Sequence, residues 1–186
     1  MEKDVSIGIS ARHVHLDEET YYKLFDTDLT VKSYLNQVGQ FAANETLTLK
    51  TENGSFESVR IIGPLRPYNQ IEISRSDART LKINPPVRRS GDVFNSESVT
   101  LKTNKDEVTI EGCIIADRHV HMTPVFAKSL GVVDNQLLKL NISGIKSGVL
   151  DVYAKVSDDG YFEVHLDTDD ANAFLINSGD IEKLII

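Results

Sequence analysis

Short runs of β-branched and aromatic residues, separated by turn residues, recur along the whole chain. Such runs are typical of strands, because branched and aromatic side chains pack well on a pleated surface. They predict strands over residues 46–50, 56–62, 70–74, 99–103, 108–116, 137–142, 149–156, 162–166 and 181–186, and a strand-like run covers residues 5–10. The chain is therefore expected to be mainly β.

Turn signals and helix signals divide these runs. Asn53-Gly54 and Asp158-Asp159-Gly160 predict hairpin turns, since Gly accepts a positive φ without strain and Asn or Asp tolerates it. Few helices are expected, and all of them are short. Residues 17–25, 124–130 and 169–177 are the segments with the best helical pattern.

One eight-residue segment occurs twice. Residues 9–16, Ile-Ser-Ala-Arg-His-Val-His-Leu, match residues 115–122, Ile-Ala-Asp-Arg-His-Val-His-Met, with five identities at an offset of 106. The repeat predicts two related β-barrel halves, residues 1–110 and residues 111–186. No linker marks this boundary, and an exchange of strands between the halves stays open.

Composition narrows the class of protein. A net charge of −8 argues against a broad nucleic-acid or anionic-membrane surface, which needs clustered Lys and Arg. No apolar run reaches the roughly 18 residues of a membrane span, and no signal peptide is recognisable, so a soluble cytoplasmic protein is expected. The single cysteine, Cys113, stands in an apolar context and is interpreted as a buried small side chain, not as a catalytic thiol.

All five histidines are expected near strand ends. Side chains alternate along a strand, so His13 and His15 point to one side, as do His119 and His121. Each pair can chelate one ion, but a pair leaves a tetrahedral site incomplete, and the only other histidine is His165. We therefore predict metal binding, with two ions favoured over one and zinc over cobalt, nickel, copper or iron. A single pair of this kind is more often a surface or core pair without a metal.

Three further segments have both a structural and a functional interpretation. Glu72 is either a solvated strand residue or a carboxylate ligand, and Arg66 is either a surface charge or a binder of phosphate. Residues 84–92 form either a surface connection or an anion-binding loop. The carboxylates of residues 167–173 suit a helix start, and such a start beside His165 would also favour an anion.

Taken together, these segments resemble the PduL family of phosphate acyltransferases, or phosphate propanoyltransferases, over nearly the whole chain. The matching motifs are Arg-His-Val-His-Leu at 12–16, Gly-Gln-Phe-Ala-Ala-Asn-Glu-Thr at 39–46, Gly-Pro-Leu-Arg at 63–66, Gln-Ile-Glu-Ile-Ser at 70–74, Pro-Val-Arg-Arg-Ser-Gly-Asp at 86–92, Arg-His-Val-His-Met at 118–122 and His-Leu-Asp-Thr-Asp-Asp-Ala-Asn-Ala at 165–173. The resemblance implies two antiparallel β-barrel domains, capped by short helices, with two metal ions in a cleft between them.

The resemblance also implies roles for individual residues. One ion would be held by His13, His15 and Glu72, and the other by His119, His121 and His165, although His165 as a proton carrier stays open. Arg66 would bind phosphate and act in catalysis. Ser10, Arg60 and Asn172 would help to hold CoA, as would Lys32, whose alignment is less secure, while Arg12 and Arg118 would be structural.

The implied reaction is the reversible transfer of a short acyl group, propanoyl or acetyl, between CoA and phosphate, without a covalent enzyme intermediate. Only twelve residues precede His13, so the N-terminal extension of members targeted to bacterial microcompartments is not expected, and a free cytoplasmic role is favoured. Asp170 stands where the family pattern commonly has Glu, and Lys82 stands where it commonly has Gly. Neither position touches the implied ligands.

Two other classes compete with this interpretation. A cupin-like metal-binding module also carries His-x-His and Glu on strands, but the glycine expected after the first element and the glutamate after the second are absent. A metal-dependent hydrolase of thioesters or acyl phosphates would use the same ligands with water in place of phosphate. The sequence does not decide between acetyl and propanoyl, and it leaves open whether the chain forms a homo-oligomer.

Overall fold

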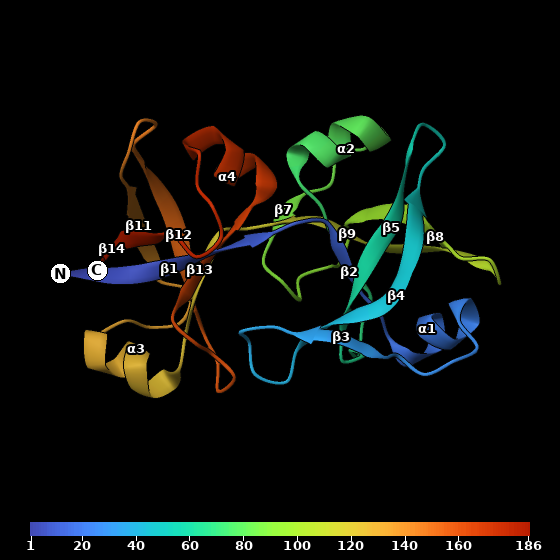
Figure 1. Cartoon of the computed structure of the whole chain (residues 1–186), viewed down its shortest axis with the longest axis horizontal. Coiled ribbons are helices and arrows are strands. Elements are labelled where there is room, and N and C mark those ends of the chain that lie inside the picture. The colour runs from blue at the N-terminus through green and yellow to red at the C-terminus, as the bar shows by residue number, and fades with distance from the viewer. The chain divides into compact units, whose positions relative to one another are not determined.

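The computed structural model describes residues 1–186 as two compact units. The terminal unit consists of Met1–Ser10 and Asp117–Ile186, and the central unit consists of Ala11–Ala116. Each unit is a closed barrel of six strands with two helices of seven residues (Figure 1). No helix has the length and apolar character that crossing a membrane requires.

The terminal unit closes around one apolar core. Its helices are α3 (Pro124–Leu130) and α4 (Thr168–Phe174). In the order of pairing, its strands are β1 (Glu2–Ser10), β13 (Glu163–Asp167), β10 (His119–Met122), β12 (Gly148–Val156), β11 (Leu137–Ile142) and β14 (Ile181–Ile185), which returns to β1. The blue β1 runs among the orange and red strands in Figure 1. Ile7, Val120, Leu140 and Val164 are fully buried inside this barrel because the alternation of each strand turns them to the same interior.

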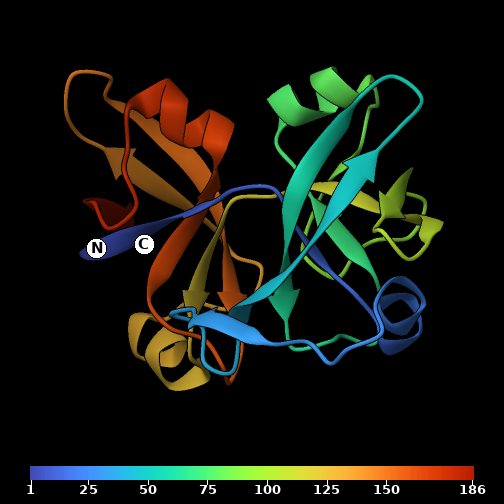
Figure 2. The ribbon, with the colours of Figure 1, turned by 45° about the vertical axis from the view of Figure 1, so that its right-hand side comes forward.

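The central unit repeats this construction around a second core. Its barrel strands, in the order of pairing, are β4 (Phe41–Lys50), β5 (Ser55–Gly63), β2 (His13–His15), β6 (Gln70–Glu72), β9 (Glu107–Ala116) and β8 (Glu97–Lys102), which returns to β4. The short strands β3 (Val31–Tyr34) and β7 (Val87–Arg88) pair outside this ring, with β4 and β9. The helices are α1 (Glu18–Leu24) and α2 (Arg75–Leu81), and the long β4–β5 hairpin is clear in Figure 2.

The two barrels have the same pairing pattern. The His-x-His strand pairs in parallel with one neighbour (β5 or β12) and antiparallel with the other (β6 or β13), which in turn pairs in parallel with the closing strand (β9 or β1). Each closing strand precedes the His-x-His strand of the other barrel in sequence, since β1 leads into β2 and β9 leads into β10. The chain is therefore a duplication in which the two copies have exchanged one strand.

The expectation of a mainly β protein with two barrels and short helices is confirmed, with the addition that each barrel contains two parallel pairs beside four antiparallel ones. The division into folding domains at residue 110 stays a prediction. The boundaries of the two compact units differ from this division, because β1 belongs to the same unit as the C-terminal segment.

Most expected elements are present within a few residues, and the differences have local causes. The Asn53-Gly54 turn joins β4 to β5 as expected, but the hairpin expected at residues 158–160 is wrong. That turn joins β12 to β13, which are not neighbours because β10 lies between them. Helix α2 was not predicted. Its start has a reciprocal capping box between Ser74 and Asp77, and its C-cap Lys82 has a positive φ of 54°, a conformation that favours glycine.

Candidate metal and active site

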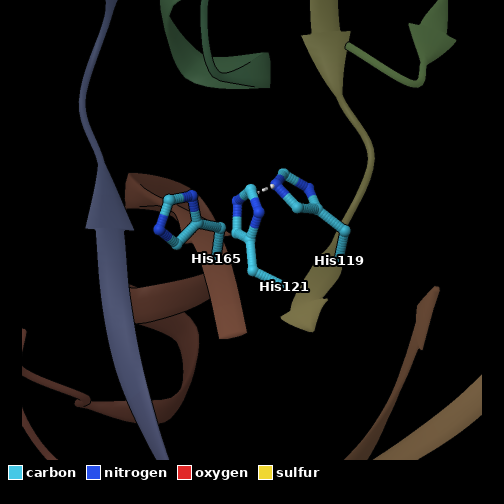
Figure 3. Close-up of side chains that lie close together, drawn as sticks. All are labelled: His119, His121 and His165. Carbon is cyan, nitrogen blue, oxygen red and sulfur yellow. Dashed lines mark hydrogen bonds between the residues drawn. The ribbon is translucent and has the colours of Figure 1, made fainter. Parts of the chain in front are cut away.

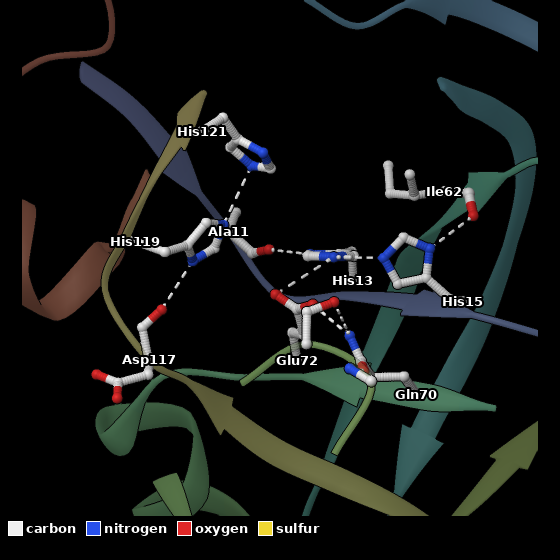
Figure 4. A network of polar contacts seen from close by, with 11 residues as sticks. Ala11, His13, His15, Ile62, Gln70, Glu72, Asp117, His119 and His121 are labelled. Carbon is white, nitrogen blue, oxygen red and sulfur yellow. Dashed lines mark hydrogen bonds and ion pairs between the residues drawn. The ribbon is translucent and has the colours of Figure 1, made fainter. Parts of the chain in front are cut away.

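In the central unit, His13, His15 and Glu72 form one group, the central cluster, whose potential ligand atoms all lie within 4.8 Å of one another. Strand pairing builds it, because β2 carries both histidines on one face and the antiparallel register places Glu72 directly opposite His13. The Nε2 atoms of the two histidines are 3.2 Å apart, and Nε2 of His13 is 3.6 Å from Oε2 of Glu72 (Figure 4).

Backbone carbonyls fix both rings of the central cluster. Nδ1–H of His13 donates to the carbonyl of Ala11 at 2.9 Å, and Nδ1–H of His15 donates to the carbonyl of Ile62 at 3.0 Å (Figure 4). A carbonyl can only accept, so Nδ1 carries a proton in both rings, and the neutral form of each ring presents a lone pair on Nε2. Two lone pairs 3.2 Å apart repel each other unless a cation lies between them. Ligand atoms about 2.0–2.1 Å from a tetrahedral zinc lie about 3.3 Å from one another, so the spacing fits a metal.

In the terminal unit, His119, His121 and His165 form the terminal cluster, again with ligand atoms within 4.8 Å of one another (Figure 3). The Nε2 atoms of His119 and His121 are 3.1 Å apart, and Nδ1–H of His119 donates to the carbonyl of Asp117 at 2.8 Å. His165 lies opposite His119 in the register, just as Glu72 lies opposite His13. The two clusters thus occupy equivalent positions of the duplicated barrel.

Burial keeps the inner histidine of each cluster neutral. Burial, and next the charge of His13, lower the pKa of His15 well below its usual value, and Arg66 acts in the same direction. Burial, His119 and His165 lower the pKa of His121 to about 2. A neutral imidazole is the form that binds a metal, so protons do not compete for these two rings near neutral pH. Nδ1 of His121 is buried without a hydrogen-bond partner.

Gln70 connects the central cluster to the segment of residues 84–92. Its amide donates to Oε1 of Glu72 at 2.5 Å and to Oγ of Ser90 at 3.0 Å, and its carbonyl oxygen accepts from the Gly91 amide at 2.6 Å. Gln70 was not among the predicted site residues. Its position two residues before Glu72 on the same strand face was the signal, because alternation sends both side chains to the same side.

Arg66 lies beside the central cluster. Its backbone amide donates to the carbonyl of Leu16 at 2.8 Å, which fixes the loop after β5 to the end of the His-x-His segment. Its positive charge is one of the causes that lower the pKa of His15. Its guanidinium carbon is 6.0 Å from the centre of the Tyr68 ring. A cation with a planar fork of donors is therefore close enough to His15 to affect its charge, and such a fork suits an anion.

The other residues expected to hold CoA belong to different elements. Arg60 lies opposite His13 on β5, and its guanidinium donates to the carbonyls of Ala43 and Asn44 at 2.8 and 3.0 Å. Lys32 is exposed on β3 in the central unit. In the terminal unit, Ser10 ends β1, and Asn172 is exposed on α4. Their binding role stays a prediction.

Asp167 and Cys113 both have structural surroundings that account for them without a role in the site. Asp167 caps α4 by accepting the Asp170 amide, so carboxylates already satisfy this helix start, which supports the structural interpretation of residues 167–173 over an anion site. Cys113 is fully buried, and burial raises the pKa of its thiol to about 12. The prediction of a buried cysteine is confirmed, and its lack of a catalytic role stays a prediction.

Tyr161 and Glu163 were missed in the sequence. The Tyr161 hydroxyl lies 2.7 Å from Nε2 of His165, and its ring stacks on His121 with centroids 5.0 Å apart. Oε1 of Glu163 lies 3.2 Å from the same Nε2. Alternation places Glu163 on the same strand face as His165, which was the only sequence signal for it. Tyr161 lies in the turn before β13, where periodicity carries no information.

Fold and site together define a duplicated-barrel protein with two equivalent sets of three potential metal ligands, one of them next to an arginine. Comparison with known proteins gives the family. The sequence profile of the phosphate propanoyltransferase family, PTAC, matches residues 6–177. Phosphate propanoyltransferase of Shewanella putrefaciens (strain CN-32) is 43% identical over all of this chain and 90% of its own length.

Two further relatives give the same result. Phosphate propanoyltransferase of Thermotoga maritima is 41% identical over 99% of this chain and 90% of its own length. Phosphate propanoyltransferase of Priestia megaterium is 45% identical over 95% of this chain and 83% of its own length. The chain therefore belongs to the phosphate propanoyltransferase family, which is a family of acyltransferases.

Proposed function

We propose that this protein is a metal-dependent phosphate acyltransferase that transfers a short acyl group, propanoyl or acetyl, reversibly between CoA and phosphate. The names of its relatives suggest the substrates. The observation that carries the metal dependence is the pairing of imidazole nitrogens at 3.2 Å in the central cluster and 3.1 Å in the terminal cluster. Such pairs are stable when a cation lies between them.

The proposed ligands are His13, His15 and Glu72 for one ion. For the other ion they are His119, His121 and His165. Nitrogen and carboxylate donors in groups of three suit zinc, which in catalytic sites takes three protein ligands and keeps one position open. A metal bound there would act as a Lewis acid that polarises a carbonyl or a phosphate oxygen.

Arg66 is the proposed phosphate-binding and catalytic residue. Its guanidinium can donate two parallel hydrogen bonds to phosphate oxygens and offset their negative charge next to the central cluster. Gln70 ties the Ser90-Gly91 turn to Glu72, because its amide donates to the Ser90 hydroxyl and to Glu72 and its carbonyl oxygen accepts from the Gly91 amide. The Gly91 amide is therefore already bonded, and the anion-binding interpretation of residues 84–92 stays a prediction that depends on Arg88 and Arg89.

In the proposed reaction, a phosphate oxygen attacks the thioester carbonyl carbon. A C–O bond forms, the C–S bond breaks, and its electron pair leaves with the CoA sulfur, which takes up a proton. The chain contributes the position of phosphate and the stabilisation of its charge, and no covalent intermediate with the protein is required. Because thioester and acyl phosphate are both activated acyl donors, the transfer is reversible.

CoA is proposed to contact Ser10, Lys32, Arg60 and Asn172. One guanidinium nitrogen of Arg60 already donates to the carbonyls of Ala43 and Asn44. Only its other N–H groups could therefore donate to a phosphate of CoA. The cytoplasmic location and a homo-oligomeric state stay predictions.

The test is to incubate the zinc-loaded protein with propanoyl-CoA or acetyl-CoA, with and without phosphate. Free thiol is then measured and the products are followed by phosphorus NMR. Thiol release that needs phosphate and yields acyl phosphate supports the proposal and ranks the two acyl groups. Release without phosphate would show a hydrolase instead, and no release in either direction would show a binding module.

A further inference from the structure

The surroundings of His165 fix which of its ring nitrogens can meet the terminal cluster. Nε2 lies 2.7 Å from the Tyr161 hydroxyl and 3.2 Å from Oε1 of Glu163, and the Tyr161 hydroxyl donates to that same Oε1 at 3.3 Å. Since an ionised carboxylate can only accept, the contact between Oε1 of Glu163 and Nε2 of His165 requires a proton on Nε2. Nδ1 then carries the lone pair. In Figure 3 the ring of His165 turns one nitrogen toward His121 and the other away from it.

Glu163 is itself held firmly. It is only 8% exposed, and Oε2 accepts a hydrogen bond from the Ser6 hydroxyl at 3.2 Å on the neighbouring strand. Gly8 lies opposite His165 in the register, and a Cβ atom there would be 2.6 Å from Oε1 of Glu163 and 2.9 Å from Cδ2 of His165. The backbone of β1 therefore packs directly against the ring and the carboxylate.

The central unit supports the same role for this position. Gln70 lies opposite His15, as Glu163 lies opposite His121, so the two residues are equivalent in the duplicated barrel. Gln70 donates its amide to the carboxylate of Glu72, whereas Glu163 accepts from the imidazole of His165. Where the third potential metal ligand is a carboxylate, its neighbour is a hydrogen-bond donor, and where it is an imidazole, its neighbour is an acceptor. In both units, the residue two positions earlier on the strand orients the third donor.

We propose that His165 contributes Nδ1 to the terminal cluster and that Glu163 and Tyr161 are positioning residues that hold its Nε2–H. The inference rests on the proposed metal site. A carboxylate behind a metal-binding histidine fixes the tautomer and the ring orientation and makes the ligating nitrogen more basic. His13 and His119 are arranged the other way round, with Nδ1–H on a backbone carbonyl and Nε2 facing the cluster.

The direct experiment is NMR of the full chain labelled with nitrogen-15 in its histidine rings, with zinc bound and with the His165 signals assigned by a His165→Gln variant. The result expected is zinc-linked shifts at Nδ1 of His165 and at Nε2 of His13 and His119. Zinc at Nε2 of His165 would overturn the inference while leaving the metal site in place. Failure of the wild-type chain to bind zinc would overturn both.

Zinc affinity gives a second readout that does not depend on turnover. In a full-length chain whose central cluster is removed by His13→Ala and His15→Ala, Glu163→Gln is expected to weaken zinc binding about 10–100-fold, and Tyr161→Phe by a smaller factor. Glu182→Gln is the matched control, because Glu182 is equally buried in the same unit but accepts from Ser143. Equal affinity of the Glu163→Gln and Glu182→Gln chains, both folded by circular dichroism, would contradict the positioning role.

Discussion

The guanidinium of Arg118 makes two parallel hydrogen bonds to the carboxylate of Asp170, at 2.7 and 2.8 Å. Arg118 directly precedes the strand of His119 and His121, while Asp170 lies in the first turn of the helix after His165. The pair thus ties together the two segments that supply the terminal cluster. The central unit repeats the arrangement, with Arg12 and Asp77 in contact at 2.6 Å.

Removing this clamp should loosen the cluster. We expect Arg118→Ala to lower the free energy of unfolding by about 1–2 kcal/mol, because the pair is bidentate and charge-assisted but partly exposed. Zinc affinity of the terminal cluster should fall as well, whereas Asp170→Glu should preserve both properties. Urea unfolding and zinc competition measure the two effects. Lys139→Ala, which breaks the exposed pair with Asp151, is the control and should change neither by a measurable amount.

Gly8→Ala should damage the terminal cluster through packing alone. The added methyl group would meet Oε1 of Glu163 and Cδ2 of His165, and overpacking of this kind costs roughly 1–3 kcal/mol of stability. We expect weaker zinc binding together with this loss. Gly131→Ala separates the two effects, because its Cβ meets open space and only its positive φ is strained. If both variants bind zinc as tightly as the wild type, Gly8 does not support His165.

Cys113 should be chemically silent in the folded protein. Burial raises the pKa of its thiol to about 12, so almost no reactive thiolate exists near neutral pH. The unfolded thiol ionises near pH 8.5, so this group's contribution to stability is full below that pH and is lost as the pH rises toward 12. Mass spectrometry should show alkylation by iodoacetamide only after unfolding, and Cys113→Ala should retain activity. Rapid labelling of the native chain would refute the assignment.

The exchanged strand predicts how the chain can be cut. A fragment of residues 111–186 lacks β1 and would expose the unpaired edges of β13 and β14, so we expect it to be unfolded or aggregated. A permuted chain that runs from 117 to 186 and continues through a short linker into 1–10 should fold. The N-terminal amino group already lies 2.7 Å from the carbonyl of Ile186. Circular dichroism and NMR dispersion distinguish the two, and a folded 111–186 fragment would instead support domains divided at residue 110.

Local pattern was enough to predict the strands of Glu72 and His165 and the shared face of each histidine pair. Alternation alone places the two histidines of each motif on one face, and the repeat of the motif predicts two equivalent sites. The role of Glu72 was harder to predict from the sequence, because a solvated strand residue would show the same alternating pattern. Only strand pairing shows that Glu72 lies opposite His13. Register, a property that depends on distant residues, brings Glu72 to the two histidines, and its role as a ligand stays a prediction.

Other features were beyond a local pattern. The exchange of β1 and β9 between the barrels depends on long-range strand pairing. Strand β1 pairs with a strand more than 100 residues away in sequence, and no local pattern of residues predicts this. Tyr161, whose hydroxyl contacts His165, lies in a turn, where neither helical nor strand periodicity predicts the direction of a side chain. The start of α2 was readable from Ser74 and Asp77, but its seven residues are too short for a clear helical period.

The most direct test of the account is zinc repletion of the chelated protein, with phosphate-dependent release of CoA from propanoyl-CoA measured at each step. We expect the chelated chain to be inactive and folded, and activity to return as zinc is added, up to about two equivalents per chain, which is one for each three-donor cluster. A zinc-free chain with full phosphate-dependent activity would contradict the account.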